Sequence, residues 1–246
     1  MSARNLVFSV GNLQGGIATV SVPIDVVVNA GYSGRNQDTV RAHVAELAEQ
    51  GVCPPPEVPM YYRLPVATLT QAERIEVTGS KTSGEVEYVL IADRDRLLVT
   101  VGSDHTDRAV ETADVLLSKQ VCPNVCSAMA WPFEEVEAHW DELILRSWSR
   151  PEGGDWTLYQ EGRCERLLAP RALLDSIRSR VARDENNGLL VFSGTIPAGD
   201  GAGALDAAFK GELFDPRLNR ALRFAYEVAH LPQPALSATA GRKSAA

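Results

Sequence analysis

The sequence predicts an α+β fold in which strands outnumber helices. Its 246 residues are 45% hydrophobic and 23% charged, which is the composition of an ordinary globular chain that buries a sizeable core. β-Branched, alternating segments outnumber amphipathic ones, and the two kinds do not alternate regularly along the chain. A large mixed or antiparallel sheet therefore fits this chain better than a doubly wound α/β fold.

The first 55 residues are predicted to contain two strands and one helix. Residues 6–10 and 17–22 are rich in β-branched side chains, and a glycine-rich turn region separates them. Apolar side chains then recur at three-to-four spacing over residues 38–50, which predicts a helix that Gly51 ends. The proline run at 54–56 holds the following segment extended, because proline fixes φ and lacks the donor that a helix needs.

The rest of the chain is predicted to be mainly strands, with helices at 134–140 and 170–183. The stretch 231–246 is rich in Pro, Ala and Ser, and we expect it to be disordered. We therefore predict a single domain over residues 1–230. Residues 1–55 form its N-terminal strands and helix, and residues 56–230 form its core. The predicted strands beyond residue 55 are 60–63, 74–77, 85–92, 97–101, 142–148, 156–160, 189–193, 207–214 and 221–228.

Charge and hydropathy exclude several classes of partner. The formal net charge is −8 without a basic patch, which argues against nucleic acid or an anionic membrane as the main partner. No apolar run approaches the ~20 residues that a membrane helix requires. The N-terminal stretch also lacks the apolar centre of a secretory signal. We therefore expect a cytoplasmic protein.

Four cysteines are too few and too scattered for a disulfide scaffold in a chain of this size. Cys122 and Cys126 are the one close pair, and the three residues between them differ from the two-residue spacing of a zinc knuckle. Reduced, structural thiols are the leading interpretation, and a metal or redox role is the alternative.

Glu85 and Glu87 are the most informative pair of residues. On a strand, side chains two apart point to the same face, so these carboxylates project side by side at the start of an apolar run. Neighbouring carboxylates repel each other unless a cation or a shared proton compensates, and a divalent cation with oxygen ligands is the simplest solution. The alternative is an exposed strand end with two ordinary glutamates.

A second polar stretch follows the strand predicted at 97–101. Asp104 there can supply a third carboxylate, and Arg108 offers a planar fork for an anionic group. Lys119 is a lone charge after a mostly apolar run and would suit a carbonyl or enolate oxygen. A surface lysine that extends its charge into solvent is the alternative for Lys119.

His43 and Glu46 lie three residues apart on the predicted helix and therefore share a face. At this spacing a carboxylate can orient an imidazole, and an oriented imidazole can deprotonate water near neutral pH. A solvated helix face explains the pair equally well.

Together, and in this order along the chain, these stretches resemble the fumarylacetoacetate hydrolase superfamily, and more narrowly a DUF2848-like prokaryotic branch defined only as a domain of unknown function. The likeness spans about residues 31–228. The motifs that carry it are Gly34-Arg35-Asn36 with His43-Val44-Ala45-Glu46, then Pro59-Met60-Tyr61-Tyr62-Arg63, Glu85-Val86-Glu87, Asp104-His105-Thr106-Asp107-Arg108, Lys119 and Gly194-Thr195-Ile196-Pro197.

The resemblance implies a mixed β-roll with a few flanking helices, a lid formed by the first helix, and a homodimer. It also implies roles for individual residues. Glu85, Glu87 and Asp104 would bind Mg²⁺, or Mn²⁺ or Ca²⁺ in its place. His43, Glu46 and Lys119 would be catalytic. The residues implied to contact a small carboxylate substrate are Arg35, Asn36, Tyr62, Arg63, Arg108 and Thr195.

The activity that the resemblance implies is hydrolysis of a carbon–carbon bond in a small 2-oxo or 2,4-dioxo acid. Water would be activated by His43 with Glu46, while the metal stabilises an enolate. A decarboxylase, hydratase or isomerase on the same scaffold remains an alternative, because one fold supports several chemistries. A non-catalytic protein that binds a small molecule is a further alternative.

Overall fold

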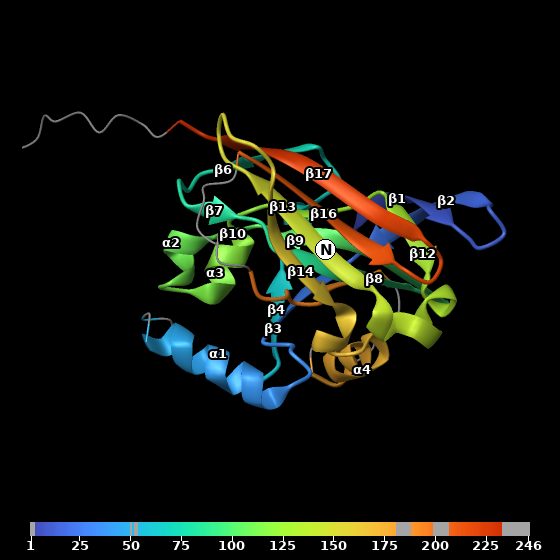
Figure 1. Ribbon diagram of the computed structural model, residues 1–246, viewed down its shortest axis with the longest axis horizontal. Coiled ribbons are helices and arrows are strands. Elements are labelled where there is room, and N and C mark those ends of the chain that lie inside the picture. Colours follow the sequence, from blue (N-terminus) through green and yellow to red (C-terminus); the bar gives the residue numbers. More distant parts are fainter. Residues whose placement is uncertain (1–2, 50, 52–53, 181–187, 199–206, 233–246) are drawn as a thin grey trace, which may run out of the picture.

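Two sheets pack against each other, and the helices lie around their edges (Figure 1). The computed structural model describes residues 3–49, 51, 54–180, 188–198 and 207–232. Within these ranges strands predominate and the larger sheet is mixed and curled. The predicted mostly-β α+β fold is therefore confirmed. No helix in these ranges is long and apolar enough to cross a membrane.

The larger sheet, as far as the chain is described, contains ten strands and holds most of the polar residues discussed below. Eight follow one another across the sheet, and β11 and β5 extend it beside β9. In spatial order the strands are β2 (Ile17–Ile24), β1 (Arg4–Gly11), β12 (Met129–Pro132), β9 (Arg96–Asp104), β8 (Val86–Asp93), β15 (Leu189–Phe192), β3 (Val26–Gly31) and β4 (Met60–Leu64), with β11 (Asn124–Cys126) and β5 (Leu69–Thr70).

The second sheet covers one face of the first. Tyr88 and Leu90 of β8 share a buried apolar cluster with Leu145, Phe209 and Tyr226 of this sheet, and that burial is the main force that holds the layers together. Its strands in order are β14 (Thr157–Arg163), β13 (Ile144–Arg150), β16 (Ala208–Asp215), β17 (Arg220–His230) and β6 (Arg74–Val77), and a short ribbon pairs β10 (Thr106–Asp107) with β7 (Thr82–Ser83).

The helices are short, and α4 contributes directly to the core through Leu173, Leu174 and Ile177. α1 lies at the periphery, at the lower left of Figure 1. The α-helices are α1 (Gln37–Glu49), α2 (Arg108–Glu111), α3 (Val115–Gln120) and α4 (Pro170–Arg180), and the 3-10 helices are η1 (Val66–Thr68), η2 (Phe133–Glu135), η3 (Glu137–Glu142) and η4 (Cys164–Arg166).

Three sequence predictions need correction or restriction. The helix predicted at 134–140 is instead two 3-10 helices that meet at Val136 (φ −117°, ψ −11°). Within the second, His139 adopts a non-helical conformation (φ −132°, ψ 27°) while its Nε2 contacts the buried Asp215 at 3.0 Å. Helices α2 and α3, and the strand β3, lie where no individual element was predicted. Residues 181–183 of the predicted third helix, and 233–246 of the predicted tail, lie outside the described residues.

A candidate metal centre in a partly enclosed cavity

A β-hairpin brings the three acidic candidates together. Glu85 lies just before β8, Glu87 lies within it, and Asp104 ends β9. The antiparallel register pairs Glu87 with Gly102, and the Asp104 N–H donates to the Glu85 carbonyl oxygen at 3.2 Å. Asp104 therefore lies beside Glu85 although the two residues are far apart in the chain.

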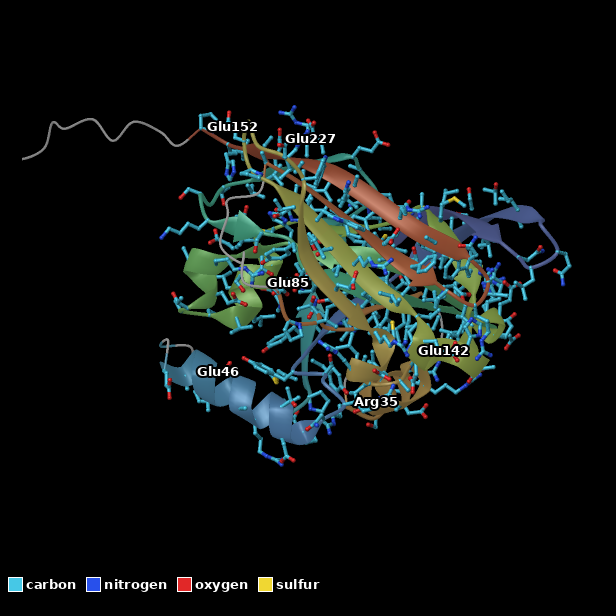
Figure 2. All side chains as sticks on the ribbon, in the orientation of Figure 1. Arg35, Glu46, Glu85, Glu142, Glu152 and Glu227 are labelled. Carbon is cyan, nitrogen blue, oxygen red and sulfur yellow. The ribbon has the colours of Figure 1, made fainter. Side chains whose placement is uncertain are left out.

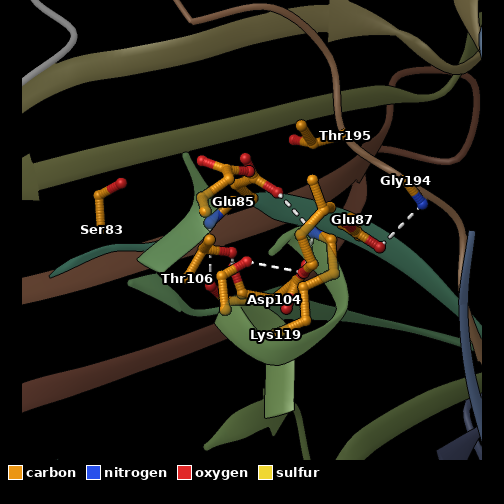
Figure 3. Close-up of polar contacts among 12 residues, drawn as sticks. Ser83, Glu85, Glu87, Asp104, Thr106, Lys119, Gly194 and Thr195 are labelled. Atoms are coloured by element: carbon orange, nitrogen blue, oxygen red, sulfur yellow. Dashed lines mark hydrogen bonds and ion pairs between the residues drawn. The ribbon is translucent and has the colours of Figure 1, made fainter. Parts of the chain in front are cut away.

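The geometry of this carboxylate triad (Glu85, Glu87 and Asp104) suits a cation. One oxygen from each residue lies within 4.8 Å of the others, and Figure 3 shows the carboxylates converging. Glu87 and Asp104 are 1% and 0% exposed, yet Glu87 Oε1 and Asp104 Oδ1 have no hydrogen-bond partner among the described residues. Buried polar atoms without partners are rare because they cost free energy, and oxygen donors are what Mg²⁺, Mn²⁺ and Ca²⁺ prefer. The residues present therefore fit a divalent cation.

Lys119 is a buried member of this cluster rather than a surface lysine. It lies on α3, whose start is capped by Asp114 through a 2.9 Å bond from the Leu117 N–H. The Lys119 Nζ donates to Asp104 Oδ2 and lies 3.6 Å from Glu85 Oε2. Only 7% of its side chain is exposed. Helix α3, which the sequence analysis did not predict, thus places a positive charge beside the carboxylates of Glu85 and Asp104.

Arg108 is held by the protein itself. Its guanidinium contacts Glu85 at 2.9 Å and Glu111 at 2.9 Å, and its Nε donates to Ser83 Oγ at 2.7 Å. These three partners fix the guanidinium, so in this structure Arg108 neutralises Glu85 and does not present its donors to the cavity.

The pKa values of two of the three carboxylates are raised, because burial and neighbouring negative charges disfavour their ionised forms. Burial, reinforced by the charge of Asp104, raises the pKa of Glu87 well above its usual value. Burial also raises the pKa of Asp104, against the opposing charge of Lys119. Burial alone would raise the pKa of Glu85 too, but Arg108 and Lys119 outweigh it and lower that pKa. A bound divalent cation would favour the ionised forms of all three carboxylates.

The loop that follows β15 completes the centre. The Gly194 N–H donates to Glu87 Oε2 at 2.8 Å. Gly194 has φ of +82°, and a Cβ there would lie 2.4 Å from the Ala30 carbonyl oxygen and 2.3 Å from Ser33 Oγ. Only glycine fits such a position without strain. The Thr195 hydroxyl next to it donates to the Val86 carbonyl oxygen at 2.8 Å, which fastens this loop to β8.

A cavity of about 660 Å³ opens beside the triad, a volume within the range of small-molecule sites. Tyr62 forms part of its wall, and burial raises the pKa of this phenol to about 12, so it is a neutral hydroxyl at physiological pH. The predicted site residues that line the cavity are Arg35, Asn36, Tyr62, Glu85, Glu87, Lys119 and Thr195.

Two of these residues, Arg35 and Asn36, also hold parts of the fold together through hydrogen bonds and an ion pair. Arg35 forms a bidentate ion pair with Asp141, with both bonds at 2.8 Å, and its Nε donates to the Leu167 carbonyl oxygen. Asn36 caps α1, since its Oδ1 accepts from the N–H groups of Asp38 and Thr39 at 3.0 and 3.2 Å. Asp38, two residues further on, lies in the first turn of the helix.

Besides Asp104 and Arg108, which belong to the triad cluster but do not line the cavity, three predicted site residues are not placed there. The side chain of His43 lies outside what the structure describes. Glu46 is exposed on α1 and does not line the cavity; Figure 2 shows it apart from Glu85. Arg63 follows Tyr62 on β4, so it points to the opposite face of the sheet, and it does not line the cavity either.

Glu111 and Asn29 are two polar cavity residues among those that the sequence analysis did not anticipate. Glu111 on α2 lines the cavity and holds Arg108; an acid three residues after an arginine on a helix could have indicated this contact. Asn29 lines the cavity from β3. The sequence feature that could have indicated Asn29 is that it is a single amide within the apolar run Val26–Ala30.

The fold and the triad together define a mostly-β protein with a carboxylate centre at the end of a sheet. The sequence profile described as "Protein of unknown function (DUF2848)" matches residues 30–226, and the chain belongs to this family. No curated protein matches the sequence.

Two solved structures share the fold. The protein named Cg1458 aligns with a TM-score of 0.61 and 12% identity over 93% of this chain and 89% of its own. A 2-keto-3-deoxyarabinonate dehydratase aligns with a TM-score of 0.62 and 14% identity over 85% of this chain and 74% of its own. The expected DUF2848 family is thereby confirmed by the profile, and the two solved structures confirm the expected mostly-β fold.

Proposed function

We propose that the protein is a divalent-metal-dependent enzyme that acts on a small 2-oxo acid. The observation that carries this proposal is the buried triad, with its two unpartnered carboxylate oxygens, at the wall of a cavity of ligand size. A dehydratase with the same fold supports an enzyme on this scaffold. Glu85, Glu87 and Asp104 would hold Mg²⁺, Mn²⁺ or Ca²⁺, which when bound polarises a carbonyl oxygen as a Lewis acid.

The residues around the triad would bind and orient the acid. Lys119 keeps its proton. Burial alone would lower its pKa, but the negative charges of Asp104 and Glu85 outweigh burial and raise the pKa above its usual value. Its ammonium group can therefore stabilise negative charge that develops on the substrate carbonyl oxygen, an effect worth about 3–4 kcal/mol for a well-placed donor. Tyr62, Arg35, Asn36 and Thr195 line the cavity where the carboxylate of the substrate would bind.

For the reaction itself we propose hydrolysis of a carbon–carbon bond in a 2,4-dioxo acid. His43, oriented by Glu46, would take a proton from water, and that water would attack the second carbonyl carbon. The bond to the adjacent carbon then breaks, and its electron pair remains with the enolate that Lys119 stabilises. In this scheme the first helix must bring His43 to the cavity, whose wall includes Thr39 and Val40 of the same helix.

A second candidate is dehydration or decarboxylation by the same enolate-stabilising centre. The observation that favours it is the position of Glu46, which is exposed and outside the cavity although the residues around the triad are already assembled. A reaction that needs no water-activating base at that position would not require this glutamate. The dehydratase of similar fold supports this candidate as well.

Metal binding can be tested without knowledge of the substrate. At a Mg²⁺ concentration 100-fold above its Kd, binding to the folded state alone adds about 2.7 kcal/mol to the unfolding free energy. We expect Mg²⁺ to raise the Tm of the wild type, and EDTA to reverse this. Both effects should be lost in Glu87→Gln and in the double variant E85Q/E87Q, and kept in the control Glu161→Gln on the exposed strand β14. A wild-type Tm insensitive to both reagents would refute the metal centre and favour a non-catalytic binding protein.

The reaction can be assigned by product analysis with Mg²⁺ present. Hydrolysis of a 2,4-dioxo acid should yield two acids in equal amounts, one of them a 2-oxo acid, with incorporation of one oxygen atom from ¹⁸O-labelled water. Release of CO₂, or loss of water from a hydroxylated 2-oxo acid without bond cleavage, would support the second candidate instead. Mass spectrometry separates these outcomes.

A further inference from the structure

Asn29 is the most unusual polar residue in the wall of the cavity. It is 0% exposed, and neither its Oδ1 nor its Nδ2 has a hydrogen-bond partner among the described residues. A buried amide that leaves its donors and its acceptor unused costs free energy that an apolar residue of similar shape would avoid. Its neighbours on β3 are Val28 and Ala30, so nothing local compensates for the amide.

The side chain faces the same side of the sheet as the triad. Val28 and Ala30 pack in one apolar cluster and Val27 in the other, so Asn29, which alternates with Val28, lies on the Val27 side. Glu87 alternates with Tyr88 in the same way and shares its face with Val89. Asn29 and Glu87 therefore project from one face of the larger sheet.

The two residues lie at opposite sides of the Gly194 loop. Gly194 donates to Glu87, and its Cα packs so closely on Ala30 that a Cβ would come within 2.4 Å of the Ala30 oxygen. β15 separates β3 from β8, so the two strands are about 10 Å apart. An elongated acid anchored at the triad would therefore extend toward Asn29 with its far end.

The chemistry of the amide selects the group that it would contact. Asn offers two donors and an acceptor, so a group that both donates and accepts satisfies it better than an acceptor alone. A second carboxylate would accept from the Nδ2 donors but would leave Oδ1 unpaired. A methyl end would leave both atoms unpaired. A hydroxyl group meets both requirements.

We infer that Asn29 is a specificity-determining residue that binds a hydroxyl group at the far end of the substrate, so that the enzyme prefers hydroxylated 2-oxo acids to alkyl or dicarboxylic ones. This inference rests on the proposed function, because the triad has to anchor the 2-oxo acid end. It adds a recognition element that the metal centre does not provide.

The test compares five-carbon ligands on two variants. Calorimetry with Mg²⁺ present would measure the binding of 2-oxopentanoate, 4-hydroxy- and 5-hydroxy-2-oxopentanoate, and 2-oxoglutarate. We expect at least one hydroxylated acid to bind the wild type about tenfold more tightly than 2-oxopentanoate and 2-oxoglutarate. In Asn29→Leu, which keeps the shape of the side chain, that preference should vanish and 2-oxopentanoate should bind at least as well as before.

A thermal melt without ligand provides an independent measurement. Asn29→Leu should raise the Tm, because it removes a buried amide without partners. The control is Asn124→Leu: Asn124 is equally buried, but its Nδ2 donates to Thr68 Oγ1 at 3.1 Å, so this variant should have a lower Tm. A lower Tm or failure to fold in Asn29→Leu would mean that the amide has a structural partner, and would overturn the inference.

The binding results separate failure of the inference from failure of the proposed function. If the wild type binds all four acids equally well, and Asn29→Leu binds them likewise, the 2-oxo acid site stands and the role of Asn29 is wrong. If none of the four acids binds the Mg²⁺-loaded wild type, the proposed function is wrong and the role of Asn29 is overturned with it.

Discussion

Glu87 is a single residue whose burial costs stability as long as no cation is bound. Its carboxylate is buried beside Asp104, and one oxygen has only the Gly194 N–H while the other has no partner among the described residues. Burying such a charge in the metal-free protein is unfavourable. Residues that are costly to the fold concentrate at functional sites, where binding compensates for them.

His43 is the residue that we propose as the base that takes a proton from water. We predict that His43→Ala slows carbon–carbon bond hydrolysis by about 10²–10⁴-fold, the usual contribution of a general base. Mg²⁺ affinity should be unchanged, because the triad lies on other elements. Steady-state kinetics with isothermal titration measures both, and Glu49→Gln, an exposed change on the same helix, is the control. Undiminished turnover in His43→Ala would eliminate the base and leave a lyase reaction as the better assignment.

At the scale of elements, the β8–β9 hairpin and the loop after β15 assemble the centre. The hairpin register places Asp104 beside Glu85, and the loop adds a donor to Glu87. A shift of one residue in that register would turn every side chain of the strand to the other face. Such a shift would turn Glu87 into the apolar cluster that Tyr88 and Leu90 occupy, and the cost of burying a carboxylate there opposes it.

The loop position depends on the missing side chain of Gly194, which two matched variants can show. Gly153→Ala introduces a Cβ at φ of +68° with nothing within 4 Å, so it should cost only the strain of a left-handed residue, about 1–2 kcal/mol. Gly194→Ala has the same strain at +82° and also collides with backbone at 2.4 Å. We expect Gly194→Ala to lose clearly more unfolding free energy in denaturant titrations, and to weaken Mg²⁺ binding as well. Equal losses in the two variants would show that the close approach to Ala30 is unimportant.

At the scale of the whole molecule, the two packed sheets bury the thiols along with the core. Cys122, Cys126 and Cys164 are free and buried. Burial raises the pKa of Cys122 and of Cys126 to about 12, and raises that of Cys164 further. The interpretation as structural thiols agrees with this burial, since a reactive cysteine needs access and a lowered pKa.

Thiol labelling tests this packing. Cys53 lies outside the described residues, so the experiment uses Cys53→Ser. At pH 8 the folded variant should react with a disulfide reagent far more slowly than the same chain in denaturant, where three thiols should react at once. The thiolate is the reacting form, so rapid labelling of the folded variant at pH 8 would mean that the core opens readily or that these pKa values are not raised.

Sequence patterns were sufficient where the physical cause is local. The apolar run of β8 and the three-to-four spacing of α1 predicted these elements to within one residue at each end, and β9 was found although it continues three residues further than predicted. Two glutamates two residues apart in an extended segment must share a face. The short helices α2 and α3 were missed, because four to six residues carry too little periodicity to be distinguished from strand or loop. Their positions depend on aspartate caps, Asp107 and Asp114, and on packing.

The sequence by itself determined the mostly-β fold, the family, and which acidic residues were candidates for a metal site. Only the tertiary structure decided which charged groups meet. Lys119 joins the triad while Arg108 and Arg35 are held by Glu85, Glu111 and Asp141, and Asn29 is left with an amide that has no partner in the described part of the chain. The physical reason is range: strand and helix patterns reflect neighbours a few residues away, whereas ion pairing and burial depend on segments that only the folded chain brings together.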